Sequence, residues 1–257
     1  MTSNKAKAIL RDGGTAIGTM ITEARSEEIG HVLAAAGFDF FVIDTEHSTA
    51  TLEAVQRISR AARSAGITPL VRIPAISYPL IARTLDAGPL GLMVPHVESA
   101  DDAREIVRCA KYPPTGERGY GLRGAVTDYS GAALPDAMGW SNAETLLMAQ
   151  VESERCLRNL DEIASVPGID VLLVGPTDLS ISLGVPGQLQ HPKMQEAYRQ
   201  VAQAAERHKI AAGLHPSDIK VVELGRDLGM RCLMYSTDVR LLLDAARQAL
   251  TILRTGR

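Results

Sequence analysis

Ionisable side chains follow directly after an apolar stretch in FDFFVIDTEHST, residues 38–49. The first half has the composition of a buried strand, but Asp44, Glu46 and His47 then occur within four positions. Carboxylates and imidazoles are costly to bury without partners, so a purely structural strand is not expected to end in this way. We therefore expect this stretch to carry Asp44, Glu46 and His47 to a functional site.

The same change from apolar to polar residues recurs at the ends of later apolar stretches. The side chains at these ends are Arg72, His96, Gln150, Glu152, Asp178, His215 and Ser236. Several have a structural explanation as well, because Asp178 is a common type of helix cap and Glu152 suits the first turn of a helix. Histidines in such positions, here His96 and His215, are more often packed or loop residues than ligands. A functional interpretation is favoured because the structural one must hold independently at five or six positions.

These residue types predict a particular chemistry. Glu152 and Asp178 supply two carboxylates, which suit Mg²⁺ or Mn²⁺ with positions left for water and substrate, whereas Zn²⁺ more often takes several His or Cys ligands. Arg72 has a planar guanidinium that suits a carboxylate or oxyanion, and His47 is the residue type that suits a proton shuttle. The GPTD stretch, residues 175–178, offers backbone N–H groups to an anion. Together they indicate chemistry on a small 2-oxo acid through an enolate.

Short apolar stretches that alternate with amphipathic ones must position these side chains. The eight strand candidates are residues 15–21, 39–46, 68–74, 90–97, 145–152, 169–175, 210–216 and 231–237. Most are continuous apolar runs, as expected of parallel strands covered on both sides. Eight strand–helix units over about 250 residues predict an α/β fold of the (β/α)8 TIM barrel type, with its chemistry at the C-terminal strand ends. A doubly wound sheet is the alternative, but no GxGxxG follows the first strand.

Glycines mark the ends of the predicted helices, and one connection between predicted elements is unusually long. Gly37, Gly66 and Gly88 each end a helical stretch, where a left-handed C-terminal cap favours glycine. Residues 111–144 contain too much Gly and Pro for one continuous helix, and connections of this length are usually functional. Because no linker or low-complexity segment is present, residues 1–257 are expected to form a single catalytic domain.

The bulk composition excludes several classes of partner. Of the 257 residues 46% are hydrophobic and 22% charged, and the net charge is -3. Without a basic run, neither nucleic acid nor an anionic membrane is an expected partner. The N-terminus lacks the apolar stretch of a signal peptide, and no apolar run reaches the ~20 residues of a membrane span. Three separate cysteines suit a reducing compartment, so we expect a cytoplasmic protein.

The motifs, taken in order, resemble those of the HpcH/HpaI class II pyruvate aldolases, a family of metal-dependent 2-oxo-acid aldolases. The matching stretches are IDTEH (43–47), LVRIP (70–74), LMVPHVESADDAREIVRCAKYPPTGERGYG (92–121), QVES (150–153) and VGPTDLS (174–180). They span nearly the whole chain. The resemblance implies an enzyme that reversibly cleaves a 4-hydroxy-2-oxo acid to pyruvate, or a related 2-oxo acid, and an aldehyde, in aromatic or sugar-acid catabolism.

The resemblance also implies a role for each candidate residue. Glu152 and Asp178 would bind Mg²⁺, Mn²⁺ or Co²⁺, His47 would be the acid/base acting through a metal-bound water, and Arg72 would stabilise the enolate and the developing alkoxide. The residues implied to contact the oxo acid are Arg72, Gln150, Gly175, Thr177 and Asp178. Asp44 and Asp86 would orient the histidine network.

Members of this family are similar to one another in forming hexamers with exchanged C-terminal helices. The resemblance therefore implies a homohexamer in which the last helix, LLLDAARQALTILRT (241–255), makes subunit contacts. The positions that depart from the family's pattern are Thr19, Met20, Ser48, Thr49 and His96. They lie around the acceptor side, so the physiological aldehyde stays open.

Other reactions on such a barrel remain alternatives. A Schiff-base aldolase is disfavoured because no lysine stands at any of the strand ends. A Claisen-type lyase or synthase, such as a citrate-forming enzyme, would need a basic patch if it used an acyl-CoA, and the candidates are Arg118 and Arg123. A non-catalytic binding barrel is disfavoured by the complete set of carboxylates, histidine and arginine.

Overall fold

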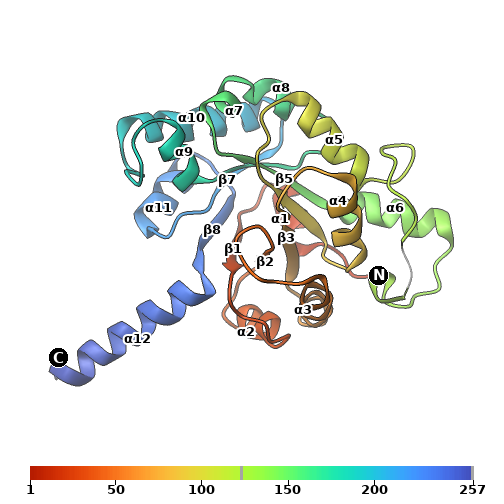
Figure 1. Ribbon diagram of the computed structural model, residues 1–257, viewed down its shortest axis with the longest axis horizontal. Coiled ribbons are helices and arrows are strands. Elements are labelled where there is room, and N and C mark those ends of the chain that lie inside the picture. The colour runs from red at the N-terminus through yellow and green to blue at the C-terminus, as the bar shows by residue number, and fades with distance from the viewer. Residues whose placement is uncertain (122–123, 256–257) are drawn as a thin grey trace.

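Within residues 1–121 and 124–255, which the computed structural model describes, eight parallel strands form a closed barrel (Figure 1). The strands are β1 (Ala16–Ile21), β2 (Phe40–Asp44), β3 (Thr68–Arg72), β4 (Gly91–Val94), β5 (Leu146–Val151), β6 (Val171–Val174), β7 (Ala211–Leu214) and β8 (Cys232–Thr237). Each strand pairs with the next in sequence, and β8 pairs with β1. The predicted (β/α)8 barrel is confirmed, and each predicted strand contains an observed one.

Helices surround this barrel (Figure 1). They are α1 (Lys5–Arg11), α2 (Ile29–Ala35), α3 (Leu52–Ser64), α4 (Tyr78–Asp86), α5 (Ala100–Ala110), α6 (Leu134–Glu144), α7 (Glu154–Arg158), α8 (Leu160–Ala164), α9 (Pro176–Ser182), α10 (Pro192–Arg207), α11 (Ile219–Asp227) and α12 (Asp238–Thr255). Hydroxyl caps begin α3 and α5, where Thr51 and Ser99 accept hydrogen bonds from backbone N–H groups. Gly37, Gly66 and Gly88 have φ of 96°, 75° and 103°, which confirms the predicted left-handed positions.

Alternate residues along each strand face two different cores. On β2, Phe41 and Ile43 pack against the surrounding helices, whereas Phe40 and Val42 face the barrel interior. The interior core also contains Leu70, Met93, Met148, Val171, Leu173 and Met234, and Ala6 and Leu10 of α1. Because residues two positions apart in a strand share a face, the residues that follow this apolar interior must point into the C-terminal mouth of the barrel.

The long connection at residues 111–144 is partly helical. It contains a short 3-10 helix, η1 (Gly124–Thr127), and it ends in α6. Pro135 lies in the first turn of α6, where its missing N–H group is not needed. The prediction that this segment is not one continuous helix is confirmed, although its final third is helical.

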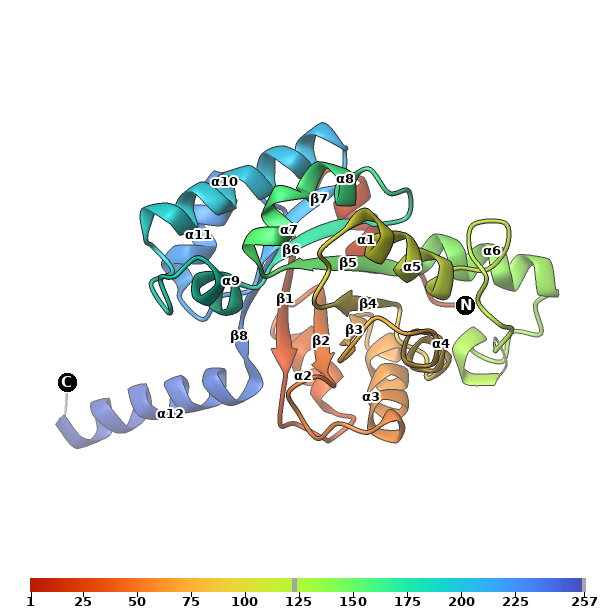
Figure 2. The same cartoon turned by 45° about the horizontal axis from the view of Figure 1, so that its top comes forward.

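The C-terminal helix α12 projects away from the barrel in both views (Figures 1 and 2). Its large apolar side chains Leu242 and Leu253 are 73% and 79% exposed. Asp238, its first residue, accepts hydrogen bonds from the backbone N–H groups of Thr22 and Ala24, and so ties the helix to the loop after β1. Across residues 1–121 and 124–255, no helix has the length and apolar character needed to cross a membrane.

Candidate active site at the mouth of the barrel

The interior face of the strands changes from apolar to polar at the mouth. Asp44 comes two residues after Val42, which faces the interior, and Gln150 has the same relation to Met148. Asp44 is also the direct register partner of Arg72 on the neighbouring strand. The alternation of the strands therefore brings these polar side chains together above the apolar core, as the sequence predicts.

An ion pair between Asp44 and Arg72 lies at the centre of the mouth. Arg72 donates from Nε to Oδ1 of Asp44 at 2.9 Å and from Nη2 to Oδ2 at 2.7 Å. The side chains are 1% and 11% exposed. Burial alone would raise the pKa of Asp44, but hydrogen bonding and charge from Arg72, with the N–H groups of Glu46 and His47, lower it. Both members of the pair are therefore charged.

The same ion pair also affects Arg72. Burial alone would lower the pKa of Arg72, but the hydrogen bonds and charge of Asp44, followed by Glu46 and Glu152, outweigh that effect and raise it. The guanidinium is thus a permanent cation held in a fixed orientation.

Glu46 connects this pair to two histidines. Its Oε2 atom lies 3.2 Å from Nη1 of Arg72, and its Oε1 atom lies 3.2 Å from Nε2 of His96. Nε2 of His47 lies 3.9 Å from Oε2. The sequence reasoning gave Glu46 no specific role, although its place two residues after Asp44 was a signal that it continues the inward alternation.

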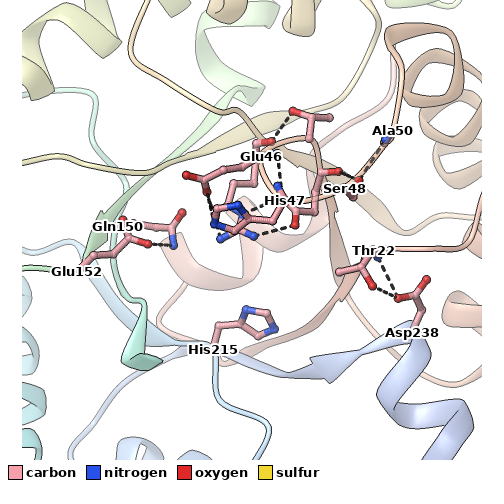
Figure 3. Close-up of polar contacts among 12 residues, drawn as sticks. Thr22, Glu46, His47, Ser48, Ala50, Gln150, Glu152, His215 and Asp238 are labelled. Carbon is pink, nitrogen blue, oxygen red and sulfur yellow. Dashed lines mark hydrogen bonds and ion pairs between the residues drawn. The ribbon is translucent and has the colours of Figure 1, made fainter. Parts of the chain in front are cut away.

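Glu152 and Gln150 lie to one side of Glu46 and His47 at the mouth (Figure 3). Oε1 of Glu152 accepts a hydrogen bond from Nε2 of Gln150 at 2.7 Å. Burial raises the pKa of the Glu152 carboxyl, and the negative charges of Asp178 and Glu46 raise it further. Gly175 leaves room here, since an added Cβ atom would lie 2.9 Å from Cγ and Oε1 of Glu152.

Glu152 and Asp178 fit a hard divalent cation. Oxygen ligands suit such an ion, and a positive charge here would relieve the repulsion that raises the pKa of Glu152. Oε1 of the buried Gln150 has no hydrogen-bond partner among the described residues, so a further oxygen faces this region. No cluster of three or more His, Cys, Asp or Glu ligands occurs in residues 1–121 and 124–255. A cation on the two carboxylates would complete its coordination with water or substrate.

The two acids expected to orient the histidine occupy different places. His47 is 67% exposed at the mouth, and Asp44 accepts from its backbone N–H group at 3.3 Å, not from its ring. Asp86 lies at the C-terminal end of α4, where its Oδ1 atom accepts a hydrogen bond from Nη2 of Arg118. Because α4 runs back from the mouth, a single chain does not bring Asp86 to His47.

The two arginines considered for a CoA patch give no support to one. Arg118 is 4% exposed, is paired with Asp86, and lies 4.9 Å from the centre of the Tyr112 ring. Its charge is therefore neutralised in the protein and is not presented to a phosphate group. Arg123 lies outside the described residues.

His215 and Ser236 face the mouth from β7 and β8. Nε2 of His215 lies 2.8 Å from the backbone oxygen of Ser236, and burial lowers the pKa of this imidazole. The buried Oγ atom of Ser236 has no hydrogen-bond partner among the described residues. Figure 3 shows His215 on the opposite side of the opening from Glu46. These groups add a polar wall whose role the sequence left open.

Comparison with known proteins agrees with this geometry. Residues 20–245 match the family model described as HpcH/HpaI aldolase/citrate lyase. The chain is similar to a hydroxypyruvate/pyruvate aldolase of Paraburkholderia phytofirmans, with 36% identity over 259 residues and 98% of each chain covered. It is 33% identical over 262 residues to a 2-keto-3-deoxy-L-rhamnonate aldolase of Escherichia coli O157:H7, covering 99% of this chain and 95% of that protein. The crystal structure of an HpcH/HpaI aldolase from Desulfitobacterium hafniense DCB-2 aligns with a TM-score of 0.92 and 35% identity over 96% of each chain.

Proposed function

The chain belongs to the HpcH/HpaI aldolase/citrate lyase family, and from this premise we propose how its mouth residues work. Aldolases of the family cleave 4-hydroxy-2-oxo acids to pyruvate and an aldehyde. The protein is an aldolase of this kind, a carbon–carbon lyase of class II. We propose that Arg72, His47, Glu152 and Asp178 carry out the reaction.

The orientation of Arg72 is the observation that carries this assignment. A guanidinium has five N–H groups. Asp44 accepts two of them, and Oε2 of Glu46 lies 3.2 Å from Nη1 without accepting a hydrogen bond. Among the contacts of the described residues, both N–H groups on Nη1 and one on Nη2 donate no hydrogen bond. Donors on both terminal nitrogens suit the 2-oxo oxygen, on which negative charge develops during cleavage.

The cleavage needs one proton acceptor and one site for the developing charge. His47 takes the proton of the substrate's 4-hydroxyl group, the C3–C4 bond breaks, and the aldehyde leaves. The electron pair of the broken bond becomes the enolate of pyruvate, whose oxygen faces Arg72. His47 then returns the proton to C3, and the reverse order of steps forms the bond.

Glu152 and Asp178 are the residues that would hold the divalent cation, whose identity among Mg²⁺, Mn²⁺ and Co²⁺ remains open. When bound, it would act as a Lewis acid that polarises the 2-oxo group. Gln150 contacts the oxo acid in this proposal. The backbone at Gly175, Thr177 and Asp178 receives its carboxylate at the start of α9.

The test of this function is metal-dependent release of pyruvate from a generic 4-hydroxy-2-oxo acid. Protein stripped with EDTA is expected to lose more than about tenfold in rate, because polarisation by the cation contributes several kcal/mol. Addition of Mg²⁺, Mn²⁺ or Co²⁺ is expected to restore the rate. Full activity after verified metal removal, together with borohydride trapping of a pyruvate adduct, would contradict the assignment and favour an imine mechanism.

We also propose that α12 is a contact between copies of this chain, with a hexamer as the expected assembly. The support is its projection from the barrel and the exposure of Leu242 and Leu253, which burial against a second copy would remove from water. Sedimentation equilibrium tests this directly. The double variant Leu242→Asp/Leu253→Asp is expected to lower the molar mass, and an unchanged mass would exclude α12 from the interface.

A further inference from the structure

Residue 96, just beyond β4, has a left-handed backbone conformation. His96 has φ of 57°, in the left-handed region, which is uncommon for residues other than glycine. Such a conformation costs of order 1–3 kcal/mol and persists only where the surroundings hold it in place. His96 is one of the positions that depart from the family's pattern, and no role for it follows from the sequence.

This conformation directs the backbone N–H group of His96 at the carboxylate of Glu152. The N–H group donates to Oε2 at 3.1 Å, while Gln150 donates to Oε1 of the same carboxylate at 2.7 Å. Each oxygen of Glu152 thus has one fixed donor, and the side chain is only 9% exposed. The two donors therefore restrict the orientation of the carboxylate.

The imidazole of His96 connects the same residue to the other half of the mouth. Its Nε2 atom lies 3.2 Å from Oε1 of Glu46, whose Oε2 atom lies 3.2 Å from Nη1 of Arg72. Its Nδ1 atom lies 3.9 Å from Oε2 of Glu152. The ring is 70% exposed and makes only ion-pair contacts, so its contribution is small compared with that of the backbone hydrogen bond.

We propose that His96 is a positioning residue, whose left-handed backbone fixes Glu152 in the orientation that binds the divalent cation. The proposal rests on the assignment of Glu152 as a ligand in the proposed function. The imidazole has a secondary part, in that it keeps Glu46 beside Arg72. If residue 96 only accommodated a strained loop, its substitution would change neither the orientation of Glu152 nor the position of Glu46.

Substitutions at residue 96 separate the backbone from the ring. His96→Gly keeps φ above zero without a steric penalty and removes the imidazole. His96→Val removes the ring as well, but a β-branched residue strongly disfavours this conformation. His96→Ala imposes a smaller penalty and serves as a second variant in case the valine variant does not fold.

The measurement is the affinity for Mn²⁺ alone, followed by electron paramagnetic resonance, which needs no turnover. His96→Val is expected to weaken Mn²⁺ binding by about 10–100-fold, as for other groups that orient a metal ligand, and His96→Ala by a smaller factor. His96→Gly is expected to bind Mn²⁺ as the parent does, while its kcat falls by at most about fivefold. Lys209, whose φ is also 57°, provides the matched control, because Lys209→Val imposes the same strain away from the mouth and is expected to leave Mn²⁺ affinity unchanged.

Parental Mn²⁺ affinity in folded His96→Val or His96→Ala protein would overturn the proposal. A loss in His96→Gly equal to that in His96→Val would overturn it too, because the backbone would not be the cause. A parent protein that binds Mn²⁺ but releases no pyruvate would refute the proposed function, and the order of affinities among the variants would still decide the role of His96.

Discussion

Replacing Arg72 by lysine retains the positive charge at the mouth but removes the planar arrangement of donors. The lysine ammonium can contact one oxygen of Asp44, whereas Arg72 contacts both. One hydrogen bond between charged groups is lost, which costs about 1.5–3 kcal/mol of the free energy of unfolding. The charge of Asp44, which is 1% exposed, remains paired, so the protein is expected to fold.

The catalytic loss is expected to be larger than the structural one. Arg72 has N–H groups on both terminal nitrogens left for the 2-oxo oxygen, and lysine cannot present such a planar set while it holds Asp44. Losing a donor to a developing oxyanion commonly costs about 10²–10³ in kcat. The Mn²⁺ affinity is expected to stay within a few-fold of the parent, because Arg72 makes no hydrogen bond to Glu152 or Asp178 among the described contacts.

Three measurements on the same preparations test this expectation: steady-state formation of pyruvate, Mn²⁺ titration and urea unfolding. Arg63→Lys is the matched control, since Arg63 is 3% exposed and its Nη2 atom lies 2.7 Å from Oδ1 of Asp128, near the end of α3 that faces away from the mouth. The control is expected to lose stability but not kcat. A parental kcat in Arg72→Lys would refute the reasoning, as would a fall in kcat matched by an equal loss of Mn²⁺ affinity.

Further predictions concern the base, the cation site and the ion pair. His47→Ala is expected to slow proton exchange at the methyl group of pyruvate by about 10²–10⁴-fold while Mn²⁺ still binds, and near-parental exchange would remove His47 from the reaction. Gly175→Ala places a Cβ atom 2.9 Å from Oε1 of Glu152 and is expected to weaken Mn²⁺ binding by about 10–100-fold. Gly139→Ala is the control, because an added Cβ atom there has no neighbour within 4 Å. Equal Mn²⁺ affinities of the two variants would contradict the packing argument. The lowered pKa of Asp44 implies stabilisation that is present above its unfolded value of about 3.9 and is lost as pH falls through its folded value. Asp44→Asn is therefore expected to be less stable at neutral pH and less sensitive to acid below about pH 4, and parallel urea-unfolding profiles of the two proteins would count against the ion pair.

Much of the barrel and of its mouth was predictable, because the spacing of the apolar runs and the alternation of residues along each strand agree. The apolar runs predicted every strand, and the alternation of β2 could be extended through Asp44 to the mouth. Arg72 followed from the same rule on β3, and the register makes it the partner of Asp44. These predictions needed only the pleat of a strand and the closure of a barrel.

The rest depended on contacts that sequence spacing does not encode. The left-handed backbone of His96 has only a weak signal in its residue type, because glycine is the usual marker of that conformation. Asp86 was expected near His47, but its contact with Arg118 is made between α4 and the segment after α5. The helix at Leu134–Glu144 was hidden in a stretch rich in Gly and Pro. Predicting these features requires the tertiary arrangement itself.

The pairing of β1 with β8 makes the order of synthesis important for this enzyme. Thr22 and Asp238, which join the loop after β1 to the last helix, are separated by 216 residues. A nascent chain therefore has an unpaired edge at β1, and an unanchored loop at the mouth, until its final segment leaves the ribosome. A product that ends before β8 would retain Arg72, His47, Glu152 and Asp178 but have an open barrel. Premature termination would thus abolish activity without removing any residue of the proposed site, and would expose an edge strand that can pair with other chains.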